Sequence, residues 1–306
     1  MKSNQPDIMN EPLLKERSYV KSISAGTRLP LRHPWGFLQQ LWPLLVLTML
    51  VFALLSGRIT SDVWTFYQEA TAEGVTPSSL LSTSFFAVTG WGVTAMFLLG
   101  IWAGQIAYLM QRYAELTYLP AVKPWKIWHD IHPHTLHGIL LCFTGYAITI
   151  GLAALSLAVM PGRIWALTLF VVLTLLWAIY YVPVGQHFMM EHRSFLSALA
   201  WPAKNIGRLG GSSAILIVCG LLVGFVICVG SIPSICAIYV SGLSEQSVAI
   251  GDGTDIPTTF GALRASTFAL TFLIAPIAWT FIFVPLCFHW GSEKAIAEES
   301  EKNIAE

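Results

Sequence analysis

Six long stretches of this chain contain no Asp, Glu, Lys or Arg, and this pattern constrains the fold more than any other feature. The uncharged stretches are 33–57, 74–111, 138–162, 164–186, 209–244 and 265–288. Each is at or above the ~20 residues that an α-helix needs to cross about 30 Å of hydrocarbon. Because 55% of the residues are hydrophobic and only 11% are charged, a water-soluble domain is excluded. The sequence therefore predicts an all-α, polytopic membrane protein.

A single transmembrane domain accounts for most of the chain. We expect it over residues 17–290, after a disordered cytoplasmic N-terminus at 1–16 and before a charged cytoplasmic tail at 291–306. The six expected transmembrane helices are about 37–57, 79–110, 137–160, 164–186, 212–240 and 264–288. The first stretch is longer than the apolar core of a signal peptide and lacks a small-residue cleavage site, so we expect it to be retained.

The basic residues predict the side of the membrane on which each loop lies. With six spans and a cytoplasmic N-terminus, only Arg58, Arg163 and Arg264 of the 17 lysines and arginines fall in outer loops. Loops on the cytoplasmic side normally carry the excess of Lys and Arg. Both termini are therefore predicted to be cytoplasmic.

The connections between the spans predict three helical hairpins, each preceded on the inner side by a basic and aromatic segment. The outer connections are expected at about 57–79, 161–163 and 241–263. The inner segments are 17–35, 112–134 and 191–211. Segments of this composition lie as interfacial helices along the headgroup layer, with Lys and Arg toward anionic lipids. The alternative is that the inner edge of any membrane hairpin collects aromatic and basic residues.

Pairs of glycines four residues apart predict where helices approach each other closely. Gly100 and Gly104 lie on the second expected span, and Gly220 and Gly224 lie on the fifth. Small residues at this spacing clear one face of a helix, so that another backbone can approach and gain packing contacts. We therefore expect the second and fifth spans to be central in the bundle.

Histidines provide the candidate ligands for a metal. All eight fall on the expected cytoplasmic side, and four of them lie in WHDIHPHTLH, where the third span begins. The candidate ligands are His129, His132, His134, His137, His187 and His192. Imidazole binds iron, copper and zinc, so a metal could bridge the ends of two helices. The alternative is that these histidines are polar residues of the membrane interface.

This histidine arrangement resembles the cytoplasmic histidine boxes of membrane di-iron desaturases and hydroxylases. Those enzymes have HxxHH-type doublets, whereas this chain has no two adjacent histidines. The resemblance implies an iron site, and the missing doublets put that site in doubt.

Other chemical signals are missing from the sequence. No ionisable residue is expected near the bilayer midplane, which disfavours a proton- or sodium-coupled transporter. Walker, GxSxG, HExxH and dinucleotide-binding motifs are absent, and a chain of zero net charge without a dense basic run has no nucleic-acid partner. The 5 cysteines all lie in apolar stretches, which indicates small buried side chains.

Two inner segments, SYVKSISAGTRLPLRHPW before the first span and RSFLSALAWPAKNIGRLGG before the fifth, carry a family resemblance together with the six-span layout. Over nearly its whole length the chain resembles uncharacterised six-span bacterial inner-membrane proteins, similar to the membrane domain of some glycerophosphodiester phosphodiesterases. The sequence shows no phosphodiesterase domain, so no catalytic residue is carried over. The resemblance implies a membrane-embedded helper or regulator in the bacterial cytoplasmic membrane.

We therefore expect a non-enzymatic integral membrane protein without a cofactor, with a role in envelope upkeep. Its expected partners are membrane lipids, and a membrane protein partner or a second copy of the chain are further candidates. One alternative is a metal- or haem-dependent membrane oxidoreductase that uses the histidines, with iron or haem as the cofactor. Another alternative is a passive carrier or channel for a neutral or hydrophobic solute.

Overall fold

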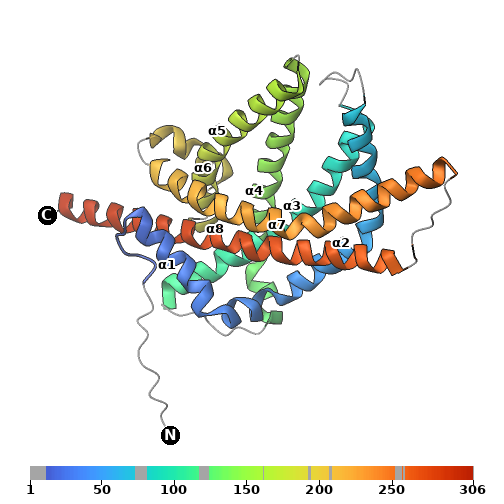
Figure 1. Cartoon of the computed structure of the whole chain (residues 1–306). Coiled ribbons are helices and arrows are strands. Elements are labelled where there is room, and N and C mark those ends of the chain that lie inside the picture. The colour runs from blue at the N-terminus through green and yellow to red at the C-terminus, as the bar shows by residue number, and fades with distance from the viewer. Residues whose placement is uncertain are drawn as a thin grey trace, which may run out of the picture.

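The computed structural model describes residues 12–72, 81–116, 124–160, 162–191, 194–206, 209–251, 257 and 259–305, without the side chains of 124–133 and 303–305. The described helices are α1 (Tyr19–Arg32), α2 (Pro34–Thr71), α3 (Thr83–Leu116), α4 (Pro124–Val159), α5 (Arg163–Met190), α6 (Phe195–Lys204), α7 (Leu209–Ala249) and α8 (Thr259–Ala305). Six of them, all except α1 and α6, are long and apolar enough to cross a membrane. The expected all-helical chain with six candidate spans is confirmed (Figure 1).

The long helices extend well beyond the uncharged stretches. α2 has 38 residues, α7 has 41 and α8 has 47, whereas about 20 residues cross the hydrocarbon. Residues that were expected in the outer connections at 57–79 and 241–263 are helical as far as Thr71 and Ala249. In α2, Arg58 and Asp62 form an ion pair across one helical turn at 3.8 Å, so the helix continues through its first charged residues.

The segments on either side of the expected transmembrane domain are described only in part. Residues 1–11 lie outside the described residues, but Leu13 is only 1% exposed and the backbone N–H of Arg17 donates to Ser292 Oγ at 2.7 Å. The expected tail at 291–306 continues α8 without a break as far as Ala305. The segment that precedes α1 therefore packs on the last part of α8.

α3 and α4 approach each other closely at glycines. A Cβ atom on Gly100 would lie 2.6 Å from Ile139 Cα, and a Cβ atom on Gly104 would lie 2.8 Å from Thr135 Cα. On α4, a Cβ atom on Gly138 would overlap the carbonyl oxygen of Gly100. The backbones can pack at this distance only because these side chains are missing.

The second glycine pair differs from its expectation. Gly220 and Gly224 of α7 have no neighbouring atom within 4 Å of an added Cβ. α7 packs along α8 through another face, with Ile215, Cys219 and Val223 buried in a small core that also contains Ala278 and Ile282 of α8. The GxxxG pair of α7 thus faces away from the described part of the chain.

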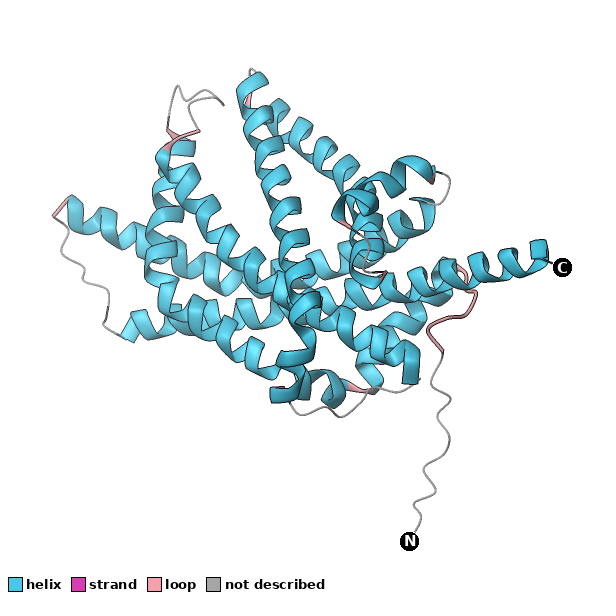
Figure 2. Cartoon of the chain, turned by 180° about the vertical axis from the view of Figure 1, so that it is seen from behind, coloured by secondary structure: helices cyan, strands magenta, loops and turns pink. Residues whose placement is uncertain are grey.

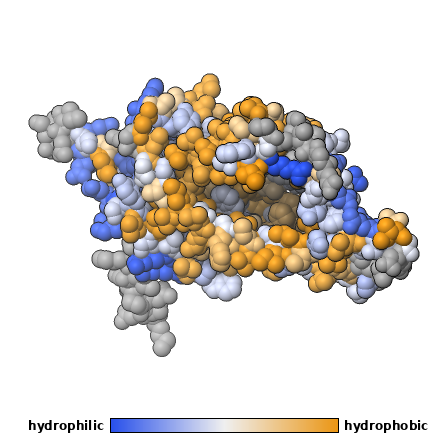
Figure 3. All heavy atoms as spheres, turned by 45° about the horizontal axis from the view of Figure 1, so that its top comes forward, coloured by the Kyte–Doolittle hydropathy of each residue, from blue (hydrophilic) through white to orange (hydrophobic). Residues whose placement is uncertain are grey.

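The helices converge at one end of the bundle, where α1, α6 and the last part of α8 lie, which we call the α1/α6 end. There Trp290 Nε1 of α8 donates a hydrogen bond to Glu191 Oε1, just after α5, at 3.0 Å. Figures 1 and 2 show the opposite ends of α4 and α5 spread away from those of α7 and α8. In Figure 3 hydrophobic residues cover most of the middle of the visible face, and hydrophilic residues gather toward its sides.

Replacing Gly138 with alanine tests the α3–α4 contact. The added methyl group would overlap the Gly100 backbone, so Gly138→Ala should lower the free energy of unfolding by about 1–3 kcal/mol. Gly151→Ala on the same helix is the matched control, because no atom lies within 4 Å of its added Cβ. Thermal unfolding of the purified protein in detergent measures both changes, and equal losses would contradict this packing.

Candidate functional site

α1 has one face of small and apolar residues that packs against α8. The spacing of Ser22, Ala25, Gly26 and Leu29 places them on one side of the helix, and all four are buried. A Cβ atom on Gly26 would overlap the backbone of Pro285 in α8. α1 ends at Arg32 because Pro34 opens α2 and the residue before a proline disfavours the helical conformation.

The opposite face of α1 is exposed and combines apolar and basic side chains. Val20 and Leu31 are 74% and 67% exposed. Exposed basic residues on the same helix are Lys21, Arg28 and Arg32. A helix that presents both kinds of side chain can insert apolar groups below the headgroups while its cations contact lipid phosphates.

α6 is the second inner segment that forms a separate short helix. Ser194 caps its N-terminus, since its Oγ accepts a hydrogen bond from the backbone N–H of Ser197. Tyr180 of α5 fixes the helix by donating to the carbonyl oxygen of Leu199 at 2.6 Å. Leu196 is 77% exposed, so α6 also presents an apolar side chain at its surface. The third expected segment, 112–134, is described only in part.

The described histidines of the candidate metal site contact different neighbours. His134 lies edge-on to Tyr108 of α3 at 5.5 Å, and His137 lies edge-on to Phe188 of α5 at 4.5 Å between ring centroids. His187 Nδ1 is 2.8 Å from Glu191 Oε1, and its ring lies 3.9 Å from that of Trp201. His129, His132 and His192 lie outside the described side chains.

These positions do not assemble a ligand set among the residues described. No group of three or more His, Cys, Asp or Glu side chains suited to a metal ion occurs in that part of the chain. The aromatic contacts of His134, His137 and His187 account for their positions as packing residues. The described residues therefore give no geometric support for an iron or haem site.

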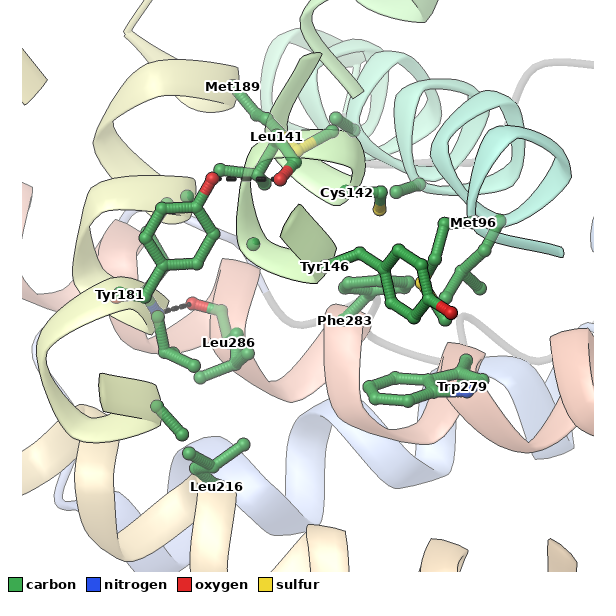
Figure 4. A pocket seen from close by; sticks show the side chains of 18 of the residues that line it. Met96, Leu141, Cys142, Tyr146, Tyr181, Met189, Leu216, Trp279, Phe283 and Leu286 are labelled. Atoms are coloured by element: carbon green, nitrogen blue, oxygen red, sulfur yellow. Dashed lines mark hydrogen bonds between the residues drawn. The ribbon is translucent and has the colours of Figure 1, made fainter. Parts of the chain in front are cut away.

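A large apolar cavity lies among α3, α4, α5, α7 and α8. No local sequence pattern predicts it. Its volume is about 540 Å³, within the range of about 300–1,000 Å³ that is usual for small-molecule sites. Figure 4 shows side chains from α4, α5 and α8 around it, with Tyr181 and Tyr146 on different sides. None of the described residues that line it is charged.

Aromatic rings form much of the wall of this apolar cavity. Trp177 and Tyr181 of α5 stack with their ring centroids 4.6 Å apart. Trp279 and Phe283 of α8 stack at 5.8 Å. Because the aromatic residues at i and i+4 lie on the same face of each helix, both pairs present broad apolar surfaces to the cavity.

Most polar groups of the wall are hydrogen-bonded to the protein itself. Tyr146 Oη donates to the carbonyl oxygen of Thr89, and Tyr181 Oη donates to that of Leu141, both at 2.8 Å. The hydroxyl of Thr174 is an exception, because it is buried without a hydrogen-bond partner in the described chain. The cavity is therefore hydrophobic, and almost none of its polar groups needs a hydrogen bond from a ligand.

A buried polar network lies beside the apolar cavity near the α1/α6 end. Gln186 Nε2 donates to the carbonyl oxygen of Leu286 at 2.9 Å, and Ser212 Oγ donates to Gln186 Oε1 at 2.9 Å. These bonds join α5 to α7 and α8 and satisfy both ends of the Gln186 amide. The network thus fixes the positions of these three helices beside the cavity.

A second, polar cleft lies between the end of α5, α6 and the last part of α8. Its volume is about 610 Å³. Its charged and aromatic lining residues are His187, Glu191, Trp201, Trp290, Glu293, Lys294, Glu298 and Glu301. Met190 lines both the polar cleft and the apolar cavity. Met190 therefore lies between the two spaces.

Substitutions at two adjacent serines test the buried polar network. Ser212→Ala would leave the buried Gln186 Oε1 without this donor and should lower the free energy of unfolding by about 1–3 kcal/mol. Ser213→Ala is the matched control, because among the described residues the Ser213 hydroxyl donates to the carbonyl oxygen of Leu209 in its own helix and to no other helix. Thermal unfolding should show a lower midpoint for Ser212→Ala alone, and unchanged stability would show that the network does not hold α5 to α7.

Comparisons with protein-family models, with curated proteins and with solved structures found no match to this chain. The resemblance to the membrane domain of glycerophosphodiester phosphodiesterases therefore stays an expectation from the sequence. The functional proposal rests on the geometry of α1, α6, the apolar cavity and the polar cleft.

Proposed function

We propose that this protein is a non-enzymatic helper of the bacterial cytoplasmic membrane that acts through lipid contacts at its inner face. In this proposal the six spans form three hairpins, and both termini are cytoplasmic. The distribution of Lys and Arg supports this orientation, because only three of the 17 fall at the other ends of the spans. The bacterial location rests on the family resemblance.

The observation that carries the proposal is the position of α1. Its small-residue face packs on α8 at Pro285, while Val20 and Leu31 remain exposed beside basic residues. A basic residue near an anionic leaflet contributes about 1 kcal/mol of attraction. α1 therefore combines a fixed attachment to the bundle with a surface suited to phospholipid headgroups.

Two alternatives have different standing. The cavity favours a second candidate function, a passive carrier for a hydrophobic solute, which flux measurements in proteoliposomes would test. The metal- or haem-dependent oxidoreductase lacks such support, because the described histidines contact separate aromatic partners. Elemental analysis and an optical spectrum of the purified protein test it directly, and near-stoichiometric iron or a Soret band would restore it.

Removing one charge from α1 tests the lipid contact. Arg28→Gln should weaken the preference of the protein for phosphatidylglycerol over phosphatidylcholine by about fivefold, the equivalent of about 1 kcal/mol. The preference is measured from spin-labelled lipids in reconstituted vesicles at low salt, and rising salt should reduce it for the unmodified protein.

Arg58→Gln provides the matched control for this experiment. Arg58 has a 75% exposed side chain and also lies on a long helix, but in the proposed topology it is on the outer side. Its replacement should leave the inner-face preference nearly unchanged. Equal losses for Arg28→Gln and Arg58→Gln would contradict a specific role for α1, and no loss for either would contradict the proposal as a whole.

A further inference from the structure

The apolar cavity and the polar cleft adjoin each other at the α1/α6 end. Met190 contributes to both linings, and the pair Gln186 and Cys287 lies on the apolar side of it. Glu191, the residue that follows Met190, lies on the polar side. A molecule that occupied both spaces would need an apolar part and a charged part of comparable size.

The apolar cavity is at least as long as one leaflet of a bilayer is deep. Along α3 its lining extends from Met96 to Ala107, which corresponds to about 16 Å at 1.5 Å per residue. Half of a hydrocarbon core of about 30 Å is ~15 Å. Along α5 the lining extends from Thr174 to Met190, which corresponds to about 24 Å, so the space is long enough for an acyl chain of one leaflet.

The lining of the apolar cavity selects for hydrocarbon. None of its described residues is charged, and the hydroxyls of Tyr146 and Tyr181 already donate to backbone carbonyls. An ionic ligand would lose its hydration here without gaining a partner. A flexible hydrocarbon chain would instead fill the space between the stacked aromatic pairs of α5 and α8.

The polar cleft selects for a different group. Four glutamates, Glu191, Glu293, Glu298 and Glu301, share its described lining with a single lysine, Lys294. Lys294 Nζ lies over the ring of Trp290, 5.3 Å from its centroid, and the His187 ring lies 3.9 Å from that of Trp201, so the cleft already pairs a cation with an aromatic face. His187 also lines the cleft and is only 5% exposed. Its buried Nε2 atom has no hydrogen-bond partner in the described chain.

We propose that the apolar cavity and the polar cleft together bind one membrane lipid, with a hydrocarbon chain among α3, α4, α5 and α8 and an ammonium headgroup in the cleft. Lys294 would lie near the phosphate of such a zwitterionic headgroup. This site is distinct from the exposed face of α1, since no residue of α1 is among the described residues that line either space. The inference goes beyond the proposed inner-face contacts, and the two can fail separately.

Photo-crosslinking in vesicles tests the site. The full-length protein is reconstituted with phosphatidylethanolamine that carries a diazirine in the middle of one acyl chain, and attachment positions are mapped by mass spectrometry. The same experiment is repeated with phosphatidylglycerol that carries the identical chain. We expect labels on residues of the apolar cavity such as Met96, Trp177 and Trp279, with a preference for phosphatidylethanolamine.

Two pairs of variants separate the chain from the headgroup. Ala178→Phe fills part of the apolar cavity and should reduce labelling there about tenfold, whereas Leu175→Phe on the exposed side of α5 should not. Glu298→Gln and Glu301→Gln should each weaken the preference for phosphatidylethanolamine by roughly two- to fivefold. Glu299→Gln is their control, because Glu299 is exposed on α8 and is not among the described lining residues.

Each outcome decides a part of the inference. Cavity labels that respond to Ala178→Phe, with a preference that responds to Glu298→Gln, support it. Equal cavity labelling by both lipids would overturn the ammonium headgroup, and labels spread evenly over the lipid-facing helices would overturn the chain site. The map of the unmodified protein decides the chain site even if Ala178→Phe fails to fold. Loss of the phosphatidylglycerol preference in Arg28→Gln with intact cavity labels would show that the α1 contact and this site are separate.

Discussion

The close approach of α3 and α4 at Gly100, Gly104 and Gly138 determines much of the remaining structure. Lipid chains are as apolar as leucine side chains, so helices in a bilayer associate through dispersion and backbone proximity rather than through the hydrophobic effect. The missing side chains bring the two backbones together toward the α1/α6 end. From that contact α4 and α5 spread away from α7 and α8 (Figure 1), and the apolar cavity lies among these helices.

Polar groups of the interior are arranged to satisfy one another. Gln186 is bonded at both ends of its amide, to Leu286 and Ser212, and thereby joins three helices. Trp102 Nε1 of α3 donates to Thr280 Oγ1 of α8 at 3.1 Å. An unpaired polar group in an apolar medium costs free energy, so such pairs restrict how the helices can pack. The bundle thus owes its specificity to a few hydrogen bonds and its compactness to glycine.

The sequence could predict the spans because the lack of charge over a long stretch is a local property. It could not predict where the helices end, since α2 continues past the charged residues Arg58 and Asp62 as far as Thr71. The same GxxxG spacing occurs at Gly100 and at Gly220, but only Gly100 meets another backbone among the described residues. A small-residue motif permits close approach, and long-range packing decides whether a partner is present.

The candidate site was the least predictable part, for the same reason. Its lining comes from five helices between Met96 and Cys287, and their relative tilt is not encoded in any local pattern. The histidines show the limit from the other side. His134 and His137 are three residues apart, as the expected shared helix face requires, yet one contacts α3 and the other contacts α5. A face of α4 that lies between two helices divides its residues between them.

The uninterrupted length of α8 gives the molecule one further property. The 47 residues of this helix include the cavity residues Trp279 and Phe283 and continue to the acidic residues Glu298 and Glu301 of the cleft. No loop separates these parts, but Pro285 lies between them and removes one backbone hydrogen bond of the helix. The bend that α8 can make at Pro285 therefore determines how the cavity wall and the charged end are oriented toward each other.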